Sequence, residues 1–297
     1  MYQEIDANKY KSAILMALFI GFVCAVGYAY GYYSDNGWFG LELALIVSLV
    51  STLFTWFAGD KVVLSTSGAK RVESREESPE LWNIVENLSI TSGTQMPAVY
   101  VIEDASPNAF ATGRDPAHAS IAVTSGLLQM MNRSELEGVL AHELSHVRNY
   151  DTRWMMIVAV LVGSISLLAD LAFRFGGMGR RKSRDNEGGA WILVIGIVLL
   201  IVAPIVGQLI KFAISRQREY LADASGALLT RYPDGLASAL EKIKASDLPV
   251  QLAPSATAHL WIASPFKSDG VAGFLGRIFS THPPIDDRIA KLHSMGH

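Results

Sequence analysis

Four apolar stretches constrain the fold of this chain more than any other feature of its sequence. They cover residues 12–33, 38–58, 154–175 and 191–214. A helix of about 20 apolar residues spans a hydrocarbon core of about 30 Å, because all of its backbone polar groups are then bonded internally. Three of the stretches begin with tryptophan, whose ring favours the headgroup layer. The sequence therefore predicts four transmembrane helices, with the lipid bilayer as a partner.

The composition agrees with a membrane protein and excludes other classes. Of the 297 residues, 50% are hydrophobic, and the mean hydropathy is +0.27, which is too high for a wholly water-soluble chain. The 25 Lys and Arg residues against 28 Asp and Glu residues offer no basic excess for nucleic-acid phosphates, so we expect no nucleic-acid partner. The single cysteine, Cys24, excludes an intrachain disulfide and leaves any metal to His, Asp or Glu ligands.

The apolar stretches divide the chain into alternating membrane and water-soluble parts. We expect residues 1–58 and 154–214 to carry two membrane helices each, and residues 59–153 and 215–297 to form one soluble unit in two pieces.

The strongest chemical signal is a pair of histidines in the first soluble piece. His142 and His146 lie four residues apart where apolar residues recur at helical spacing, so both imidazoles project from one helix face. We expect Ser134 to cap the start of this helix, with Glu137 completing a capping box. The spacing suits two imidazole ligands of zinc, and Glu143 could polarise a metal-bound water without binding the metal.

A catalytic zinc usually has three protein ligands and an open position for water, so a third ligand is expected elsewhere. Residues 215–226 place Glu219 and Asp223 on one helix face. Glu219 is the candidate ligand, whereas Asp223 would accept the distal N–H of a ligand histidine and fix its tautomer. Asp151, five residues beyond His146, is a second candidate for that supporting role. Taken alone, the 215–226 stretch is equally a solvated charged helix turn.

Together these motifs resemble the HtpX-type membrane zinc metalloproteases, relatives of the CAAX prenyl proteases. The resemblance rests on PNAFATG at 107–113, HELSH at 142–146, RQREYLAD at 216–223, THPP at 281–284, and Arg288. It implies an α+β, mostly α, zincin-like fold with a small β-sheet and four membrane helices.

The resemblance also implies roles for single residues. His142, His146 and Glu219 would bind one zinc ion, and Glu143 would be the general base. Proteolytic quality control of misfolded or damaged membrane proteins would be the function.

Two runs rich in β-branched residues, 98–103 and 120–124, predict a small sheet beside the zinc helix. The segment between them would pair with a substrate backbone by strand addition, which makes Asn108, Ala109 and Phe110 candidates for substrate binding. An ordinary connecting loop with an Asx turn is the alternative.

The C-terminal region adds two further polar candidates. His282 and Arg288 flank a turn that leads into a short helix, and either could stabilise the oxyanion formed during hydrolysis. Alternatively, Arg288 pairs with Asp286, Asp287 or Asp223 for structural reasons. The histidines without a surrounding motif are expected at the surface: His118, His259, His293 and His297.

The distribution of basic residues predicts the orientation in a cell (inner or plasma) membrane. Lys9 and Lys11 precede the first stretch and Lys61 follows the second, so the termini and the active site are expected in the cytoplasm. Because both soluble pieces must meet at one metal, the third and fourth stretches either both cross or both fail to cross. The basic residues of segment 180–184 favour a hairpin that does not cross, whereas the family resemblance favours four full crossings.

Two other functions stay open at this point. The chain could be a zinc-binding membrane adaptor or pseudoprotease that binds unfolded segments without cleaving them, or a zinc hydrolase acting on something other than peptides. Structural zinc sites are usually closed and Cys-rich, so three ligands beside Glu143 favour a zinc endopeptidase acting on polypeptides, above all membrane proteins. The substrates, the cleavage preference and the oligomeric state are not encoded in any motif that we find.

Overall fold

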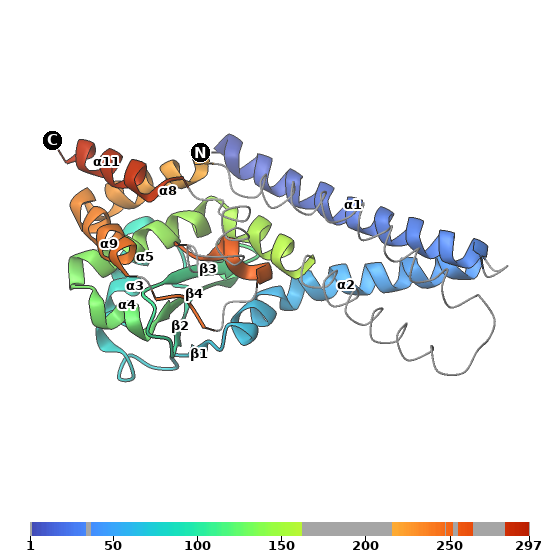
Figure 1. The fold of residues 1–297 in the computed structure, drawn as a ribbon, viewed down its shortest axis with the longest axis horizontal. Coiled ribbons are helices and arrows are strands. Elements are labelled where there is room, and N and C mark those ends of the chain that lie inside the picture. The colour runs from blue at the N-terminus through green and yellow to red at the C-terminus, as the bar shows by residue number, and fades with distance from the viewer. Residues whose placement is uncertain are drawn as a thin grey trace.

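Two long antiparallel helices, α1 (Tyr2–Tyr33) and α2 (Gly37–Thr66), project from one side of the molecule (Figure 1). The structure, a computed structural model, describes residues 2–33, 37–161, 216–246, 248–251, 255–263 and 283–296. Segments of both helices, Asn8–Ala25 and Trp38–Thr66, are long and apolar enough to cross a membrane.

The surface of this helix pair suits lipid. Large apolar side chains such as Leu18, Ile46 and Leu53 are exposed, which is unusual for so many residues on a water-soluble protein. The helices themselves pack closely, since a Cβ at Gly27 would lie only 2.2 Å from the Cβ of Ala44.

The described residues contain two of the four predicted membrane helices, α1 and α2. The third expected span begins inside the described residues, where residues 151–161 are helical and residues 154–161 are buried. The rest of it, the whole fourth span and the basic segment 180–184 lie outside the described residues. The second span also differs from expectation, because α2 continues past Ala58 to Thr66 and brings the chain directly to the soluble unit.

The soluble unit contains a small mixed sheet. Its strands are β1 (Lys70–Arg71), β2 (Ala98–Ile102), β3 (Ala109–Gly113) and β4 (Ala119–Thr124), in the order β1-β2-β4-β3. β2 runs parallel to β4, whereas the other two pairs are antiparallel. The two β-branched runs thus form β2 and β4, and the predicted extended segment between them forms β3, which confirms the small sheet.

Helices cover one face of this sheet, with α5 (Arg133–Arg148) between the sheet and the C-terminal helices (Figure 1). The remaining described helices are α3 (Pro79–Ser92), α4 (Ser125–Met130), α8 (Arg216–Thr230), α9 (Pro233–Ala245) and α11 (Ile285–Met295), with the short 3₁₀ helices η1 (Pro116–His118) and η3 (Ser255–Leu260). The soluble unit is therefore mostly α.

The predicted apolar stripe of α5 is the centre of the core. Its members are all buried: Leu136, Val139, Leu140, Leu144 and Val147. They pack with apolar side chains of β4 and α9, and each buried leucine contributes about 1.5–3 kcal/mol through removal from water. The stripe thereby fixes the rotation of α5 about its axis, and with it the direction of the polar side chains at 142, 143 and 146.

The start of α5 differs from the predicted cap. Asn132, not Ser134, is the N-cap: its Oδ1 accepts from the backbone N–H of Glu135 at 3.0 Å. The Glu135 carboxylate accepts from the Asn132 N–H at 2.8 Å, which completes the capping box. The sequence fits both pairs, since a glutamate follows each cap residue by three positions, and asparagine caps a helix at least as well as serine.

A second apolar cluster joins the membrane helices to the soluble unit. Leu15 of α1 and Val63 of α2 pack with residues 154–161, Phe110 of β3 and Trp261. The ring centroids of Phe110 and Trp261 lie 4.8 Å apart at an interplanar angle of 66°. The helix pair is therefore docked on the same strand that borders α5.

Candidate metal centre

α5 and α8 bring the three candidate ligands together. His142 and His146 are buried on one face of α5, and their Nε2 atoms lie 3.2 Å apart. Glu219 of α8 lies opposite, with its carboxylate oxygens 3.8 Å from His142 Nε2 and 3.5 Å from His146 Nε2. One ligand atom from each residue lies within 4.8 Å of the others. Two imidazoles and one carboxylate are a donor set that suits zinc.

Small residues allow this close approach of the two helices. Ala222 of α8 is fully buried, and a Cβ at Gly226 would lie 3.0 Å from the backbone nitrogen of His142. Larger side chains at these two positions would push α8 outward and carry Glu219 away from the histidines.

Asp223 and Arg288 support His142. The Asp223 Oδ1 lies 2.9 Å from His142 Nδ1, which is the contact expected for a residue that fixes the tautomer. Arg288 of α11 donates two hydrogen bonds to the same carboxylate, from Nε to Oδ2 at 2.9 Å and from Nη2 to Oδ1 at 2.7 Å. The arginine is 1% exposed, so this is a buried bidentate ion pair.

This environment keeps His142 neutral and Asp223 ionised. Burial, with the Arg288 cation beside the ring, lowers the pKa of His142 to about 4. Burial alone would raise the pKa of Asp223, but the Arg288 cation and the contact with His142 lower it to about 2. A neutral ring that donates Nδ1–H to Asp223 directs the lone pair of Nε2 toward Glu219 and His146.

Asp151 supports His146 from the other side. Its Oδ2 lies 3.0 Å from His146 Nδ1. Burial alone would lower the pKa of His146, but the hydrogen bond to Asp151 and the charge of Glu219 raise it to about 9. A metal ligand must be a neutral imidazole, so binding of a metal expels a proton from this ring.

The general-base candidate Glu143 faces the same space. It is 2% exposed, and its charge raises the pKa of both His146 and Arg288. These effects place the Glu143 carboxylate near His146 and Arg288.

The candidates for substrate binding lie on β3, and two of the side chains have partners within the chain. Asn108 Nδ2 donates to the carbonyl oxygen of Ala263 at 3.0 Å. Ile262 N–H donates to the Ala109 carbonyl at 2.9 Å, so a short segment of the chain pairs with the outer edge of β3. Phe110 is fully buried against Trp261. The side chains of Asn108 and Phe110 are therefore engaged within the chain.

Two supporting residues escaped the sequence analysis. Asn8 Nδ2 donates to Asp151 Oδ1 at 2.8 Å, and Arg218 Nη1 lies 3.5 Å from the same oxygen. Arg218 lies inside the RQREYLAD motif but was given no role there, and Asn8 belongs to none of the motifs. Asn8 is an amide at the edge of an apolar run, and its burial beside Asp151 was the missing information.

The expectation for the remaining histidines is partly wrong. His259 is buried, with Nε2 3.0 Å from the carbonyl oxygen of Met155. An imidazole can be buried when a backbone group satisfies it, and no motif in the sequence signals this. His118 and His293 are exposed as expected, whereas His282 and His297 lie outside the described residues.

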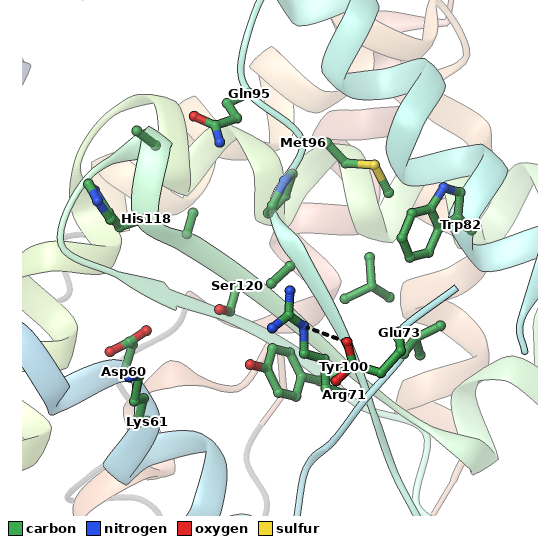
Figure 2. A pocket seen from close by; sticks show the side chains of 16 residues that line it. Asp60, Lys61, Arg71, Glu73, Trp82, Gln95, Met96, Tyr100, His118 and Ser120 are labelled. Carbon is green, nitrogen blue, oxygen red and sulfur yellow. Dashed lines mark ion pairs between the residues drawn. The ribbon is translucent and has the colours of Figure 1, made fainter. Parts of the chain in front are cut away.

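A surface pocket of about 420 Å³ lies away from this centre (Figure 2). Its lining includes Lys61, Tyr100 and His118, and the ion pair between Arg71 and Glu73 at 3.6 Å lies within it. It shares no residue with the candidate metal ligands on α5 and α8, so this pocket is separate from the candidate metal centre.

Comparison with known proteins identifies the family. The profile of peptidase family M48 matches residues 75–296. A Protease HtpX homolog of Lactobacillus helveticus (strain DPC 4571) is 45% identical over 303 aligned positions, which cover 99% of this chain and all of the relative. A Protease HtpX homolog of Tropheryma whipplei (strain Twist) is 45% identical, with 100% of this chain and 99% of the relative covered.

A solved structure supports the fold. The crystal structure of S. mikatae Ste24p aligns with a TM-score of 0.50 at 18% identity, over 98% of this chain and 67% of that chain. At this identity the similarity is evidence for the fold alone. With the family profile and the full-length relatives, the conclusion is that the chain belongs to peptidase family M48 and is a membrane metalloprotease of the HtpX type.

Proposed function

We propose that this protein is a zinc endopeptidase of the cell membrane that cleaves misfolded or damaged membrane proteins at its cytoplasmic face. The observation that carries the proposal is the buried cluster of His142, His146 and Glu219, with Glu143 facing the same space. A set of three ligands leaves a position for water, which is the arrangement of catalytic rather than structural zinc sites.

Different residues of the chain bind the metal, transfer the proton and position the metal ligands during hydrolysis. Zinc, when bound by His142, His146 and Glu219, supplies Lewis acidity that lowers the pKa of water and polarises the scissile carbonyl. Glu143 accepts the proton of the attacking water and passes it to the leaving amine. Asp223 and Asp151 hold the two imidazoles in the tautomer that presents Nε2.

Arg288 is better assigned to positioning than to the oxyanion. Its Nε and Nη2 bind Asp223, and its Nη1 lies 3.4 Å from the carbonyl oxygen of Ile262 and 3.7 Å from Glu219. This is the structural pairing that the sequence left as an alternative. His282, outside the described residues, stays the candidate for stabilising the oxyanion.

The outer edge of β3 at Ala111, next to the part that pairs with Ile262, is the proposed binding site for the substrate backbone. The Ala109 carbonyl faces away from β4, since it accepts from Ile262, and strand alternation directs the N–H and C=O groups of Ala111 the same way. A substrate strand added there would be recognised through its main chain, which suits many unfolded sequences.

The position of the helix ends supports an active site at the membrane surface. The start of α1 and the end of α2 both lie at the soluble unit (Figure 1). Lys9, Lys11 and Lys61 are near these ends, and basic residues favour the cytoplasmic side. Four full crossings would keep both soluble pieces on that side.

Cleavage of a fluorescent unfolded protein by the purified full chain tests the proposal. The wild type should be inactivated by a chelator and restored by zinc. Glu143→Ala should bind zinc and cleave nothing, whereas His142→Ala should lose both properties. Turnover by Glu143→Ala would refute the assigned role.

The same experiment separates the alternative function. A wild type that holds one zinc per chain and captures the unfolded protein, but leaves it uncut in detergent and in liposomes, would favour the membrane adaptor. Cleavage of a folded and an unfolded form of one membrane protein, compared in liposomes, tests quality control: equal rates would contradict it.

A further inference from the structure

Asn8 lies on the first membrane helix, yet its side chain belongs to the surroundings of the metal centre. We propose that Asn8 is a positioning residue, which holds Asp151 so that His146 keeps its metal-binding orientation and makes α1 a working part of the active site. The inference rests on the proposed function, because it takes His146 as a metal ligand.

The geometry of Asn8 uses its whole carboxamide. Nδ2 donates to Asp151 Oδ1 at 2.8 Å and to the Asn149 carbonyl oxygen at 2.9 Å. Oδ1 lies 3.4 Å from Nη1 of Arg218, which donates to it. The residue is 0% exposed. Two donors toward oxygens and one acceptor toward a cation match asparagine, whereas an aspartate would face Asp151 with like charge.

Asp151 passes this constraint to the metal ligand. Its Oδ1 is held by Asn8, and its Oδ2 lies 3.0 Å from His146 Nδ1. A carboxylate fixed at both oxygens cannot rotate, so it fixes the plane and the tautomer of the imidazole. Asn8 is thus separated from His146 by one side chain, although the two residues are 138 positions apart in the sequence.

Docking of α1 does not by itself require an amide here. Leu15 and Phe19, about two and three turns further along α1, pack in the apolar cluster with residues 154–161. A polar group buried in such a contact lowers the stability of the fold unless each of its hydrogen bonds is made. Asn8 makes these bonds with Asp151 and with Arg218, which precedes the candidate ligand Glu219 directly. The amide therefore gives precision at the metal centre that apolar packing cannot give.

Through this contact, the docking of α1 and the binding of the metal affect each other. If docked α1 favours metal binding through Asn8, bound metal must favour docked α1 by the same factor. A displacement of α1 in the bilayer would release Asp151 and weaken the hold on zinc.

The test compares Asn8→Leu with Ser12→Ala in the full chain. Ser12 is a matched control: it is buried on α1, one turn from Asn8, and its hydroxyl donates to the Asn8 backbone carbonyl at 2.8 Å without reaching Asp151. Zinc affinity is measured by chelator competition, the site geometry by the visible absorption of the cobalt-substituted chain, and turnover as separate kcat and KM.

We expect Asn8→Leu to lose roughly 10-fold in zinc affinity, with an altered cobalt spectrum and a lower kcat at unchanged KM, and Ser12→Ala to match the wild type. A folded Asn8→Leu with wild-type affinity and cobalt spectrum would overturn the proposal. These two measurements need no peptide, so their result stands apart from any failure of the protease activity.

A second pair of variants guards against misfolding of Asn8→Leu. Asn8→Asp keeps the size of the side chain but opposes Asp151 with like charge, and should weaken zinc binding. Adding Asp151→Asn to it restores a donor between the two positions and should recover part of the lost affinity. Losses that simply add in the double variant would show that the two residues act independently and would overturn the proposal.

Discussion

The two histidines of α5 have the same kind of neighbour but are held in different ways. Each presents Nδ1 to a buried aspartate, at 2.9 Å for His142 and 3.0 Å for His146. The aspartate of His142 is gripped by the Arg288 cation from the C-terminal helix α11. The aspartate of His146 is bound at 2.8 Å by the neutral amide of Asn8 from the membrane helix α1, and the Arg218 cation of α8 lies further away, at 3.5 Å.

The difference appears in the protonation of the two rings. The Arg288 cation offsets Asp223, and burial then lowers the pKa of His142 to about 4. Around His146, burial is outweighed by the hydrogen bond to Asp151 and by the charges of Glu219 and Asp151, and its pKa rises to about 9. Asp223 is thus held by a bidentate ion pair, whereas the shortest contact that holds Asp151 from outside α5 is the hydrogen bond from an amide.

The largest effect is expected on the charged side, from Asp223→Asn. It leaves Arg288 buried without its carboxylate, and a stranded buried charge costs 3–5 kcal/mol, of which we expect about 3 because Glu219 lies 3.7 Å from Arg288. Thermal unfolding of the full chain measures this. Asp286→Asn, which removes an exposed partner of Lys244, is the control and should cost less than about 1 kcal/mol. Equal stability of the two variants would contradict the account.

On the neutral side, Asp151→Asn should affect the metal more than the fold. An amide at this position can accept from Asn8 or from His146 but not from both, and His146 loses the carboxylate that makes it a stronger ligand, so zinc affinity should fall about 10-fold to 100-fold. Chelator competition gives the affinity and thermal unfolding the stability. A large loss of stability with unchanged zinc affinity would reverse the proposed roles of the two sides.

The sequence predicts those parts of the site that follow from local rules. Helical spacing places His142, Glu143 and His146 on one buried helix, and the motif after the fourth apolar stretch marks Glu219 and Asp223. Their partner residues depend on how distant helices pack. Asp151 was one of several acidic residues near the motif, and Arg288 had three candidate partners, of which the structure selects Asp223.

Other features had no signal that a single sequence can carry. Asn8 sits in a run whose neighbours predict only a membrane helix, and its role arises from docking of α1 on α8 and residues 149–151. The cap of α5 was misplaced because two overlapping patterns obey the same local rule, and only the backbone geometry of Asn132 decides between them. His259 was placed at the surface because polarity predicts exposure unless a buried partner is known.

The dependence on pH should distinguish the two sides. Since zinc must displace a proton from His146, whose pKa is raised to about 9, affinity should fall about tenfold for each pH unit below that value. His142 is already neutral in this range. Chelator competition between about pH 6 and about pH 9 measures the slope, and Asp151→Asn should shift its onset to lower pH because the ring loses the carboxylate. An onset that is unchanged by Asp151→Asn would contradict this assignment.

Asp223 makes a separate contribution at acid pH. Its pKa is lowered from 3.8 to about 2, so its stabilising effect is complete above 3.8 and is lost as the pH falls toward 2. Acid unfolding should therefore begin at higher pH in Asp223→Asn than in the wild type.

The smallest effect concerns the helix that both sides share. Asn132→Ala removes the cap of α5 and should cost about 1 kcal/mol, whereas Ser134→Ala should stay within about 0.5 kcal/mol. Zinc affinity should change little in either variant, because both histidines move together. A larger cost at Ser134 would restore the cap that the sequence predicted.

X-ray absorption at the zinc edge of the full chain, wild type beside His142→Ala, tests the central claim most directly. The account predicts one zinc per wild-type chain with only nitrogen and oxygen neighbours at about 2.0–2.1 Å, two of them imidazoles, and a loss of zinc in His142→Ala. A sulfur neighbour, more than two imidazoles, or a wild-type spectrum in His142→Ala would show that the metal is held elsewhere.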